Sequence, residues 1–199
     1  MDDIVLKAMT RWPNVPAVFG WLSLNQRGRW CIKGELIGNP TIAAFIGRNY
    51  AADAQGRWFF QNGPQQVFVD LEYTPFVYRL WSIDSSVYPA IESHTGAPVE
   101  RTTACWLDDV GNVLLETEFG IGVVEGASLQ ALLACLCDPA GNPLSATQLE
   151  RIIGAGLHAE HQAFLVVEPG RLPVRPLKKA EVAKRFGYIQ LPSAPSPQQ

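Results

Sequence analysis

Short apolar runs alternate with polar segments that end in glycine. Apolar runs cover residues 18–24, 30–32 and 58–60. Four polar segments share one plan, an Asn or Asp followed three positions later by Gly: residues 25–28, 53–56, 108–111 and 138–141. The first side chain accepts a backbone hydrogen bond, and the glycine takes the left-handed conformation that ends a type I turn in a hairpin. The first three segments therefore predict antiparallel hairpins, whereas the fourth follows a helical pattern and is interpreted as a loop between helices.

A helix is predicted after the first hairpin. Asn39 is a favourable N-cap and Pro40 a favourable first helical residue, and Ile42, Phe45 and Ile46 then fall on one face. Extended segments resume at residues 57–61, 65–72 and 76–83, with tight turns at residues 62–64 and 73–75 between them. The order of the first half is hairpin, helix, meander.

The second half repeats this order loosely. Strands are predicted at residues 102–107 and 113–117, before a helix that begins near Ser128. Its apolar stripe is formed by Leu129, Leu132, Leu133 and Leu136. Ser145 and Gln148 form a capping box that opens another helix, and residues 178–186 form a further helical stretch.

The pattern predicts an α+β fold of antiparallel hairpins and a meander with packed helices. The repetition is consistent with two related hairpin–helix halves. Residues 1–90 would form an aromatic-rich half and residues 91–190 a half with three helices, and residues 84–100 read as a linker or long loop. Residues 191–199 are polar and rich in proline, which predicts a disordered tail.

Composition narrows the class of protein. Hydrophobic residues make up 47% of the chain, enough for a core without disulfides. The acidic start Met1-Asp2-Asp3 is unlike a secretory signal, and residues 129–137 are too short to cross a bilayer. The four cysteines show no paired framework. We expect a cytoplasmic protein without membrane or nucleic-acid partners.

Charge is distributed unevenly although the net charge is only −3. Residues 1–170 carry −8 and residues 171–199 carry +5. The basic C-terminal segment could bind an anionic partner, or it could fold back onto the acidic body, which is the commoner outcome.

A family resemblance is carried by the glycine and aromatic positions of residues 18–80. The pattern runs through Gly28-x-Trp30, Gly34, Ile37, the capped helix, Gly56-x-Trp58-Phe59, Val67-Phe68-Val69-x-Leu71-Glu72 and Pro75-Phe76-Val77. It resembles bacterial families of domains of unknown function. The resemblance implies an α+β fold with repeated structural motifs and a ligand-binding or signalling role, and it implies no catalytic residue.

Candidate binding residues gather on the predicted meander. If residues 73–74 form a hairpin tip, Leu71 faces Phe76, and Asp70 lies diagonal to Arg79. Acids, an arginine and amides on an aromatic sheet face could line a site for a small polar ligand. The alternative is a solvated face with one weak ion pair. The predicted site comprises Phe60, Gln61, Asn62, Gln65, Phe68, Asp70, Glu72 and Arg79.

Evidence for catalysis or metal binding is weak. No nucleophile elbow, P-loop or zincin motif is present. Cys135 and Cys137 with His158 and His161 could supply four zinc ligands, but residues two apart on a helix diverge. We therefore expect no catalytic residue, metal or cofactor.

The expected function is that of a non-enzymatic module with a regulatory role, which binds a small polar ligand or a protein partner over the aromatic-rich half. The competing hypothesis is an enzyme or metal-binding protein with its site between the halves.

Overall fold

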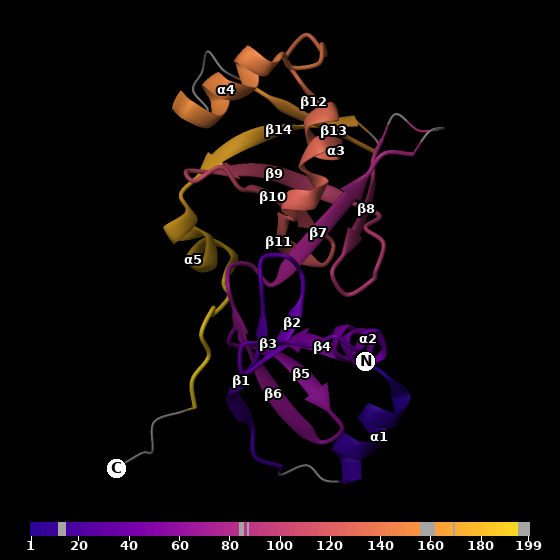
Figure 1. Cartoon of the computed structure of the whole chain (residues 1–199). Helices are drawn as coiled ribbons and strands as arrows, with labels where there is room; N and C mark the ends of the chain where they lie inside the picture. Colours follow the sequence, from indigo (N-terminus) through magenta and orange to yellow (C-terminus); the bar gives the residue numbers. More distant parts are fainter. Residues whose placement is uncertain (12–14, 84–85, 87, 156–161, 169, 195–199) are drawn as a thin grey trace. The chain divides into compact units, whose positions relative to one another are not determined.

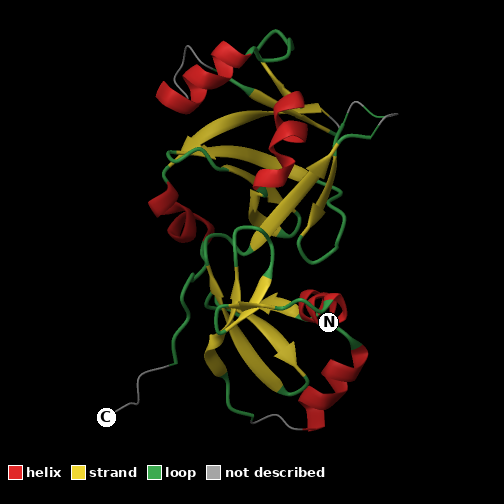
Figure 2. Cartoon of the chain, in the orientation of Figure 1, coloured by secondary structure: helices red, strands yellow, loops and turns green. Residues whose placement is uncertain are grey.

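The computed structural model describes residues 1–11, 15–83, 86, 88–155, 162–168 and 170–194. Strands outnumber helices along the chain, and the fold is α+β as predicted (Figure 2). Contacts divide the chain into two compact units. Unit 1 comprises Met1–Pro75, His94–Gly96 and Ala183–Gln199, and unit 2 comprises Phe76–Ser93 and Ala97–Val182.

Unit 1 contains a sheet of six strands in the order β3-β2-β1-β6-β5-β4 (Figure 1). The central strands β1 and β6 run parallel, and every other neighbouring pair is antiparallel. The elements are α1 (Asp3–Arg11), β1 (Val18–Leu24), β2 (Trp30–Ile32), β3 (Glu35–Leu36), α2 (Pro40–Arg48), β4 (Tyr50–Ala52), β5 (Trp58–Asn62) and β6 (Gln65–Leu71).

Unit 2 contains a sheet of eight strands in the order β12-β13-β14-β9-β10-β11-β7-β8. Here β9 and β14 run parallel, as do β7 and β11. Its strands are β7 (Phe76–Trp81), β8 (Ala90–Ser93), β9 (Thr102–Asp108), β10 (Val113–Thr117), β11 (Gly120–Val124), β12 (Leu136–Cys137), β13 (Phe164–Val167) and β14 (Gly170–Leu177). Its helical segments are η1 (Gly126–Ser128), α3 (Leu129–Ala134), α4 (Ala146–Ala155) and η2 (Lys179–Glu181), and α5 (Val182–Phe186) follows.

The sheets are mixed, so the prediction of simply antiparallel sheets is wrong in this respect. The predicted hairpin between residues 65–72 and 76–83 does not form, because β6 belongs to the unit 1 sheet and β7 to the unit 2 sheet. Tyr73 and Thr74, which would have been its exposed tip, are buried at 2% exposure each. The expected linker over residues 84–100 contains β8, which pairs with β7.

The glycine-ended turns form as predicted. In the turn between β4 and β5, Asp53 Oδ1 accepts hydrogen bonds from the N–H groups of Gln55 and Arg57, each at 2.9 Å. Gly56 closes the turn with φ +77° and donates its N–H to the Asp53 carbonyl at 3.1 Å. Asn25 and Asp108 accept equivalent bonds in their own turns, so the hairpins β1/β2 and β9/β10 are confirmed.

The fourth turn is also a hairpin turn, which corrects its interpretation as a loop between helices. Cys137 forms an antiparallel bridge with Pro143 across it, and Asp138 Oδ1 accepts the N–H of Asn142 at 2.9 Å. The backbone and side chain of Asn142 hold the pKa of Asp138 below its ordinary value. The turn was assigned to a loop between helices because Leu136 fits the apolar stripe of the preceding helix. In the structure α3 ends at Ala134, and Leu136 belongs to β12.

The C-terminal segment of unit 1 is bound to the second turn. Ile189 donates its N–H to the Gly56 carbonyl at 2.9 Å, and Leu71 donates its N–H to the Gln190 carbonyl at 2.8 Å. A Cβ on Gly56 would clash with the Gly187 carbonyl oxygen. Gly56 is therefore required both by its positive φ and by the close approach of this segment.

Replacing Gly56 with Ala should destabilise the protein more than replacing Gly34 with Ala. Both glycines have positive φ, but a Cβ on Gly34 would meet no atom within 4 Å. We expect Gly34→Ala to cost about 1 kcal/mol for backbone strain. Gly56→Ala should cost a further 1–3 kcal/mol, roughly, because backbone must move. Urea unfolding measures both, and equal losses would contradict the close approach.

Candidate functional site

A pocket of about 510 Å³ lies between α2 and one face of the unit 1 sheet. Its volume is in the range typical of small-molecule sites. It is lined by Val18, Trp21, Leu22, Ile32, Ile42, Phe45, Ile46, Phe60, Asn62, Gln65 and Val67.

Strand register brings the lining residues onto one face. Val18 pairs with Val67 in the parallel ladder, and Val67 in turn pairs with Phe60 across the antiparallel one. Residues opposite one another share a face, and alternate residues on a strand return to it. Asn62 and Gln65 pair by the same register and extend this face to the turn that joins β5 and β6. Four strands and α2 thus contribute to one apolar wall.

The N-terminus of α2 is fixed as the sequence predicts. Asn39 caps the helix, with its Oδ1 accepting the N–H groups of Thr41 at 2.9 Å and Ile42 at 3.3 Å. Pro40 occupies the first turn, where its missing N–H costs nothing. Ile42, which follows this cap, lines the pocket together with Phe45.

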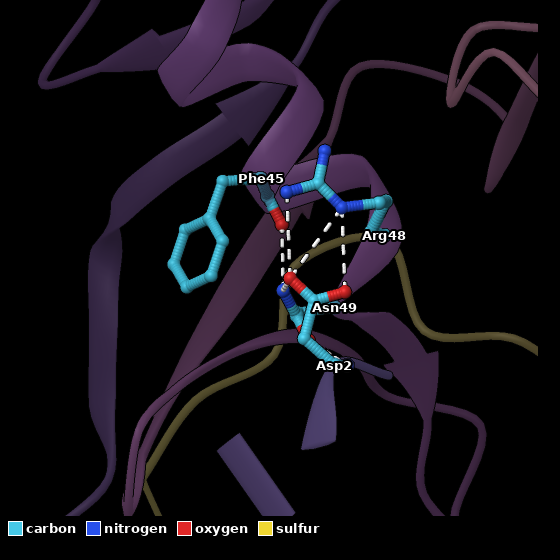
Figure 3. Close-up of polar contacts among 4 residues, drawn as sticks. All are labelled: Asp2, Phe45, Arg48 and Asn49. Atoms are coloured by element: carbon cyan, nitrogen blue, oxygen red, sulfur yellow. Dashed lines mark hydrogen bonds and ion pairs between the residues drawn. The ribbon is translucent and has the colours of Figure 1, made fainter. Parts of the chain in front are cut away.

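The C-terminus of α2 is anchored by a polar cluster (Figure 3). Asn49 is fully buried and donates its Nδ2–H to the Phe45 carbonyl at 2.9 Å, while its Oδ1 accepts the N–H of Asp2 at 2.7 Å. The Asp2 carboxylate pairs with Arg48 at 3.3 Å. This cluster fastens the segment before α1 to the end of α2 and fixes the backbone that carries Phe45.

The mouth of the pocket is an exposed apolar rim. Trp21, Ile32 and Ile42 line the pocket and are 52%, 47% and 46% exposed. Large apolar side chains that remain half exposed around a concave site are typical of a surface that binds something. Lys33 lies against this rim, with Nζ 4.0 Å from the centroid of the Trp21 ring.

Within the described part of the chain, polar side chains reach the pocket at one end. Asn62 and Gln65 supply side-chain amides, and Gln65 donates its Nε2–H to the Pro16 carbonyl at 3.4 Å. The remaining described lining residues are apolar, and none of them carries a charge. Such a wall suits an apolar body, and hydrogen bonding within the wall itself is confined to these two amides.

The structure divides the predicted site residues between different places. Phe60, Asn62 and Gln65 line the pocket. Phe68 lies on the opposite face of the sheet, where its ring stacks on Phe19 with centroids 4.5 Å apart. Gln61 shares that opposite face by strand alternation, and it is 1% exposed.

Asp70 also lies on the face opposite the pocket. It is the register partner of Ser23, and no described residue forms a hydrogen bond or ion pair with its carboxylate. Burial raises the pKa of Asp70 above its ordinary value of 3.8.

Glu72 and Arg79 have partners elsewhere. Glu72 Oε2 accepts the N–H of Gln26 at 2.9 Å, which ties the end of β6 to the first turn. Arg79 belongs to unit 2, where its Nε donates to Glu125 Oε2 at 2.9 Å. The predicted facing of Leu71 with Phe76 is wrong, since the two residues belong to strands of different sheets.

The sequence reasoning missed most of the lining. Ile42, Phe45 and Ile46 were expected to share one face of the helix, yet no pocket was expected beneath them. The alternation of side chains along a strand could have shown which of the predicted residues share a face. Phe60 and Asn62 have one parity and Gln61 the other, so they could not line one site together.

Metal ligands do not cluster among the described residues. No group of three or more His, Cys, Asp or Glu side chains in that part of the chain could hold an ion. Cys135 and Cys137 are free thiols, and His158 and His161 lie outside the described residues. Each described helix is too short or too polar to span a membrane.

The comparison with family models decides the classification. A model named DUF2944 and described as "Protein of unknown function (DUF2946)" matches residues 1–193. The chain belongs to the DUF2944 family. The expected membership in a family of unknown function is thereby confirmed. The comparison of this DUF2944 chain with curated proteins gave no match.

Two solved structures resemble the DUF2944 chain. A DUF1285 family protein from Silicibacter pomeroyi DSS-3 is 14% identical, with a TM-score of 0.50 over 76% of this chain and 100% of that one. A DUF1285 family protein from Shewanella baltica OS155 is 17% identical, with a TM-score of 0.43 over 55% of this chain and 87% of that one. The first likeness concerns the fold alone.

Replacing Asp70 with Asn should stabilise the protein at pH 7. The raised pKa means that the folded state holds its proton at pH values where the unfolded chain, with a pKa near 3.8, has lost it. Ionised Asp70 therefore opposes folding at neutral pH, and this cost disappears as the pH falls below 3.8. Urea unfolding from pH 3 to pH 7 should show a gain for Asp70→Asn that grows with pH.

Glu35→Gln is the matched control, because Glu35 is an exposed acid of the same sheet and should give little change. A gain for Asp70→Asn that does not depend on pH would contradict the assigned cause. Asp70→Ala and Arg79→Ala test the predicted site itself: if both leave stability and all ligand binding unchanged, those residues do not belong to it.

Proposed function

We propose that unit 1 is a ligand-binding module whose α2 pocket holds a compound with an apolar body and one hydrogen-bonding end. This refines the expectation of a small polar ligand, since the lining favours an apolar body. The observation that carries the proposal is the combination of a cavity of about 510 Å³ with a rim of half-exposed Trp21, Ile32 and Ile42. Covering that rim removes apolar surface from water, which favours binding by about 25 cal/mol per Å².

The side chains that line the pocket favour ligand binding over catalysis. Among the described residues of the wall, the only polar side chains are the amides of Asn62 and Gln65, which neither titrate near neutral pH nor act as nucleophiles. We therefore propose a non-enzymatic, regulatory role in the cytoplasm, with the occupied and empty pocket as the two states. A protein partner that inserts an apolar side chain at the same rim is the second candidate, favoured by the exposure of Trp21.

We also propose that the two units are related copies of one plan. In unit 1 the order is β3-β2-β1-β6-β5-β4, and six strands of unit 2 follow the order β11-β10-β9-β14-β13-β12. In both, the first and last strands pair in parallel, and a helix follows the third strand. The Asx–Gly turns follow the first and fourth strands in both units, which explains why the chain repeats them.

The comparison of the units supports an unfilled site in unit 1. In unit 2 the strand face beneath α3 is also contacted by α4, whose Leu149 and Ile152 help to enclose a cavity of only about 50 Å³. Unit 1 has no helix between β4 and β5 to correspond to α4. In unit 1, α2 covers this sheet face only in part, and the α2 pocket remains between the helix and the sheet.

Ile42→Arg should weaken the binding of a neutral apolar probe such as 1-decanol by at least about tenfold. A guanidinium at the mouth must be desolvated when the ligand enters, and about 1.4 kcal/mol of that cost lowers affinity tenfold. Because Ile42 is half exposed, the substitution should leave folding intact. Isothermal titration calorimetry gives the affinities.

Ile4→Arg is the control, since Ile4 is 73% exposed on α1 and does not line the pocket. It should bind the probe as the unmodified protein does. No binding of 1-decanol to the unmodified protein, or equal losses in both variants, would contradict the proposed site.

A further inference from the structure

Lys33 is held in a defined place by its backbone. Lys33 and Gly34 form the two-residue turn between β2 and β3, with φ of 49° and 86°. Positive φ at both positions is the geometry of a type I′ hairpin. A left-handed conformation is uncommon for lysine, and Lys33 also donates its N–H to the Trp21 carbonyl at 2.8 Å. The turn therefore folds toward β1 and the pocket rim.

The ammonium group of Lys33 lies over a side chain of the pocket. Its Nζ is 4.0 Å from the centroid of the Trp21 ring, and the indole lines the pocket. A cation–π contact of this kind holds the ammonium near the ring while leaving its N–H groups able to donate. No described residue forms an ion pair with Lys33. A cation that no described acid neutralises thus lies beside an apolar pocket.

Glu35 is the acid to be weighed against this cation. It pairs with Ile32, so its side chain points to the pocket face of the sheet. However, Glu35 lies on the edge strand β3, two strands away from the β1 strand that carries Trp21. Neighbouring strands are about 4.8 Å apart, which puts roughly 10 Å between β3 and β1. Lys33 reaches back to Trp21, so the positive group is the nearer one.

We propose that the ligand of the α2 pocket is a monoanionic amphiphile: an apolar body within the wall and a carboxylate at Lys33. This inference rests on the proposed function of the pocket. The uncharged lining requires the negative charge to lie outside the wall, because an unpaired charge within it would lose its hydration without compensation. Lys33 is the cation placed to receive it at the rim.

Three ten-carbon probes of different charge test the proposal: decanoate, 1-decanol and decylamine at pH 7.5, measured by calorimetry on the full chain. We expect decanoate to bind most tightly and decylamine least. Lys33→Met should weaken decanoate binding by about two- to fivefold, the range of an exposed ion pair, and leave 1-decanol unchanged. Lys33→Arg should retain the preference, and raising the salt to 0.5 M should reduce it.

Glu35→Gln is the matched variant in the same hairpin, and it should leave decanoate binding equal or slightly tighter. Decylamine binding as tightly as decanoate would overturn the proposal, as would equal losses of decanoate and 1-decanol in Lys33→Met. If 1-decanol binds but charge has no effect, only this inference fails. If none of the three probes binds, the proposed function fails as well.

Discussion

β1 and β6 pair in parallel at the centre of the unit 1 sheet, and all other strands of that sheet are hydrogen-bonded outward from this pair. Two parallel strands cannot be joined by a tight turn, so the chain between them must form a crossover. Here the crossover contains β2, β3, α2, β4 and β5. The pairing sets Val18 beside Val67 and Leu22 beside Val69. It thereby joins the β1/β2 and β5/β6 hairpins into one sheet face. That face is too wide for α2 to cover completely.

The incomplete cover has a physical cause. Nine-residue α2 is fixed at its N-terminus by Asn39 and at its C-terminus by the buried Asn49, so it cannot slide to close the space over Trp21 and Ile32. Protein interiors normally fill such space, since every unburied apolar side chain gives up dispersion contacts and hydrophobic stabilisation. In unit 2 the helical layer beside the sheet contains α4 as well as α3, and the cavity there is small. On the proposal that the two units share one plan, the layer is closed in unit 2 and open in unit 1, which is consistent with a site kept available for a ligand.

Local features of the fold could be predicted from the sequence because short-range chemistry determines them. Asn39 and Pro40 begin a helix as predicted. Ser145 and Gln148 form the predicted capping box, in which the Ser145 N–H donates to Gln148 Oε1 at 2.8 Å. Gly28 and Gly56 close hairpin turns. Long-range pairing could not be predicted in the same way. The sequence of residues 73–75 is compatible with a next strand that turns back beside β6 and with one that enters another sheet. The burial of Tyr73 and Thr74 distinguishes the two cases, and it is known only from the structure. For the site, Phe60 and the amides at the β5–β6 turn were recognised. Most of the remaining wall comes from β1, β2 and α2, whose meeting depends on the β1/β6 pair.

The central claim is that the α2 pocket of unit 1 is an available binding site. Methyl-labelled NMR of the full chain, titrated with 1-decanol, tests it most directly because it reports position as well as binding. We predict that the methyl signals of Val18, Ile42 and Val67 shift, and that those of Leu132 and Leu165 in unit 2 do not. Unchanged signals for the first three, or shifts of the same size in both units, would contradict it.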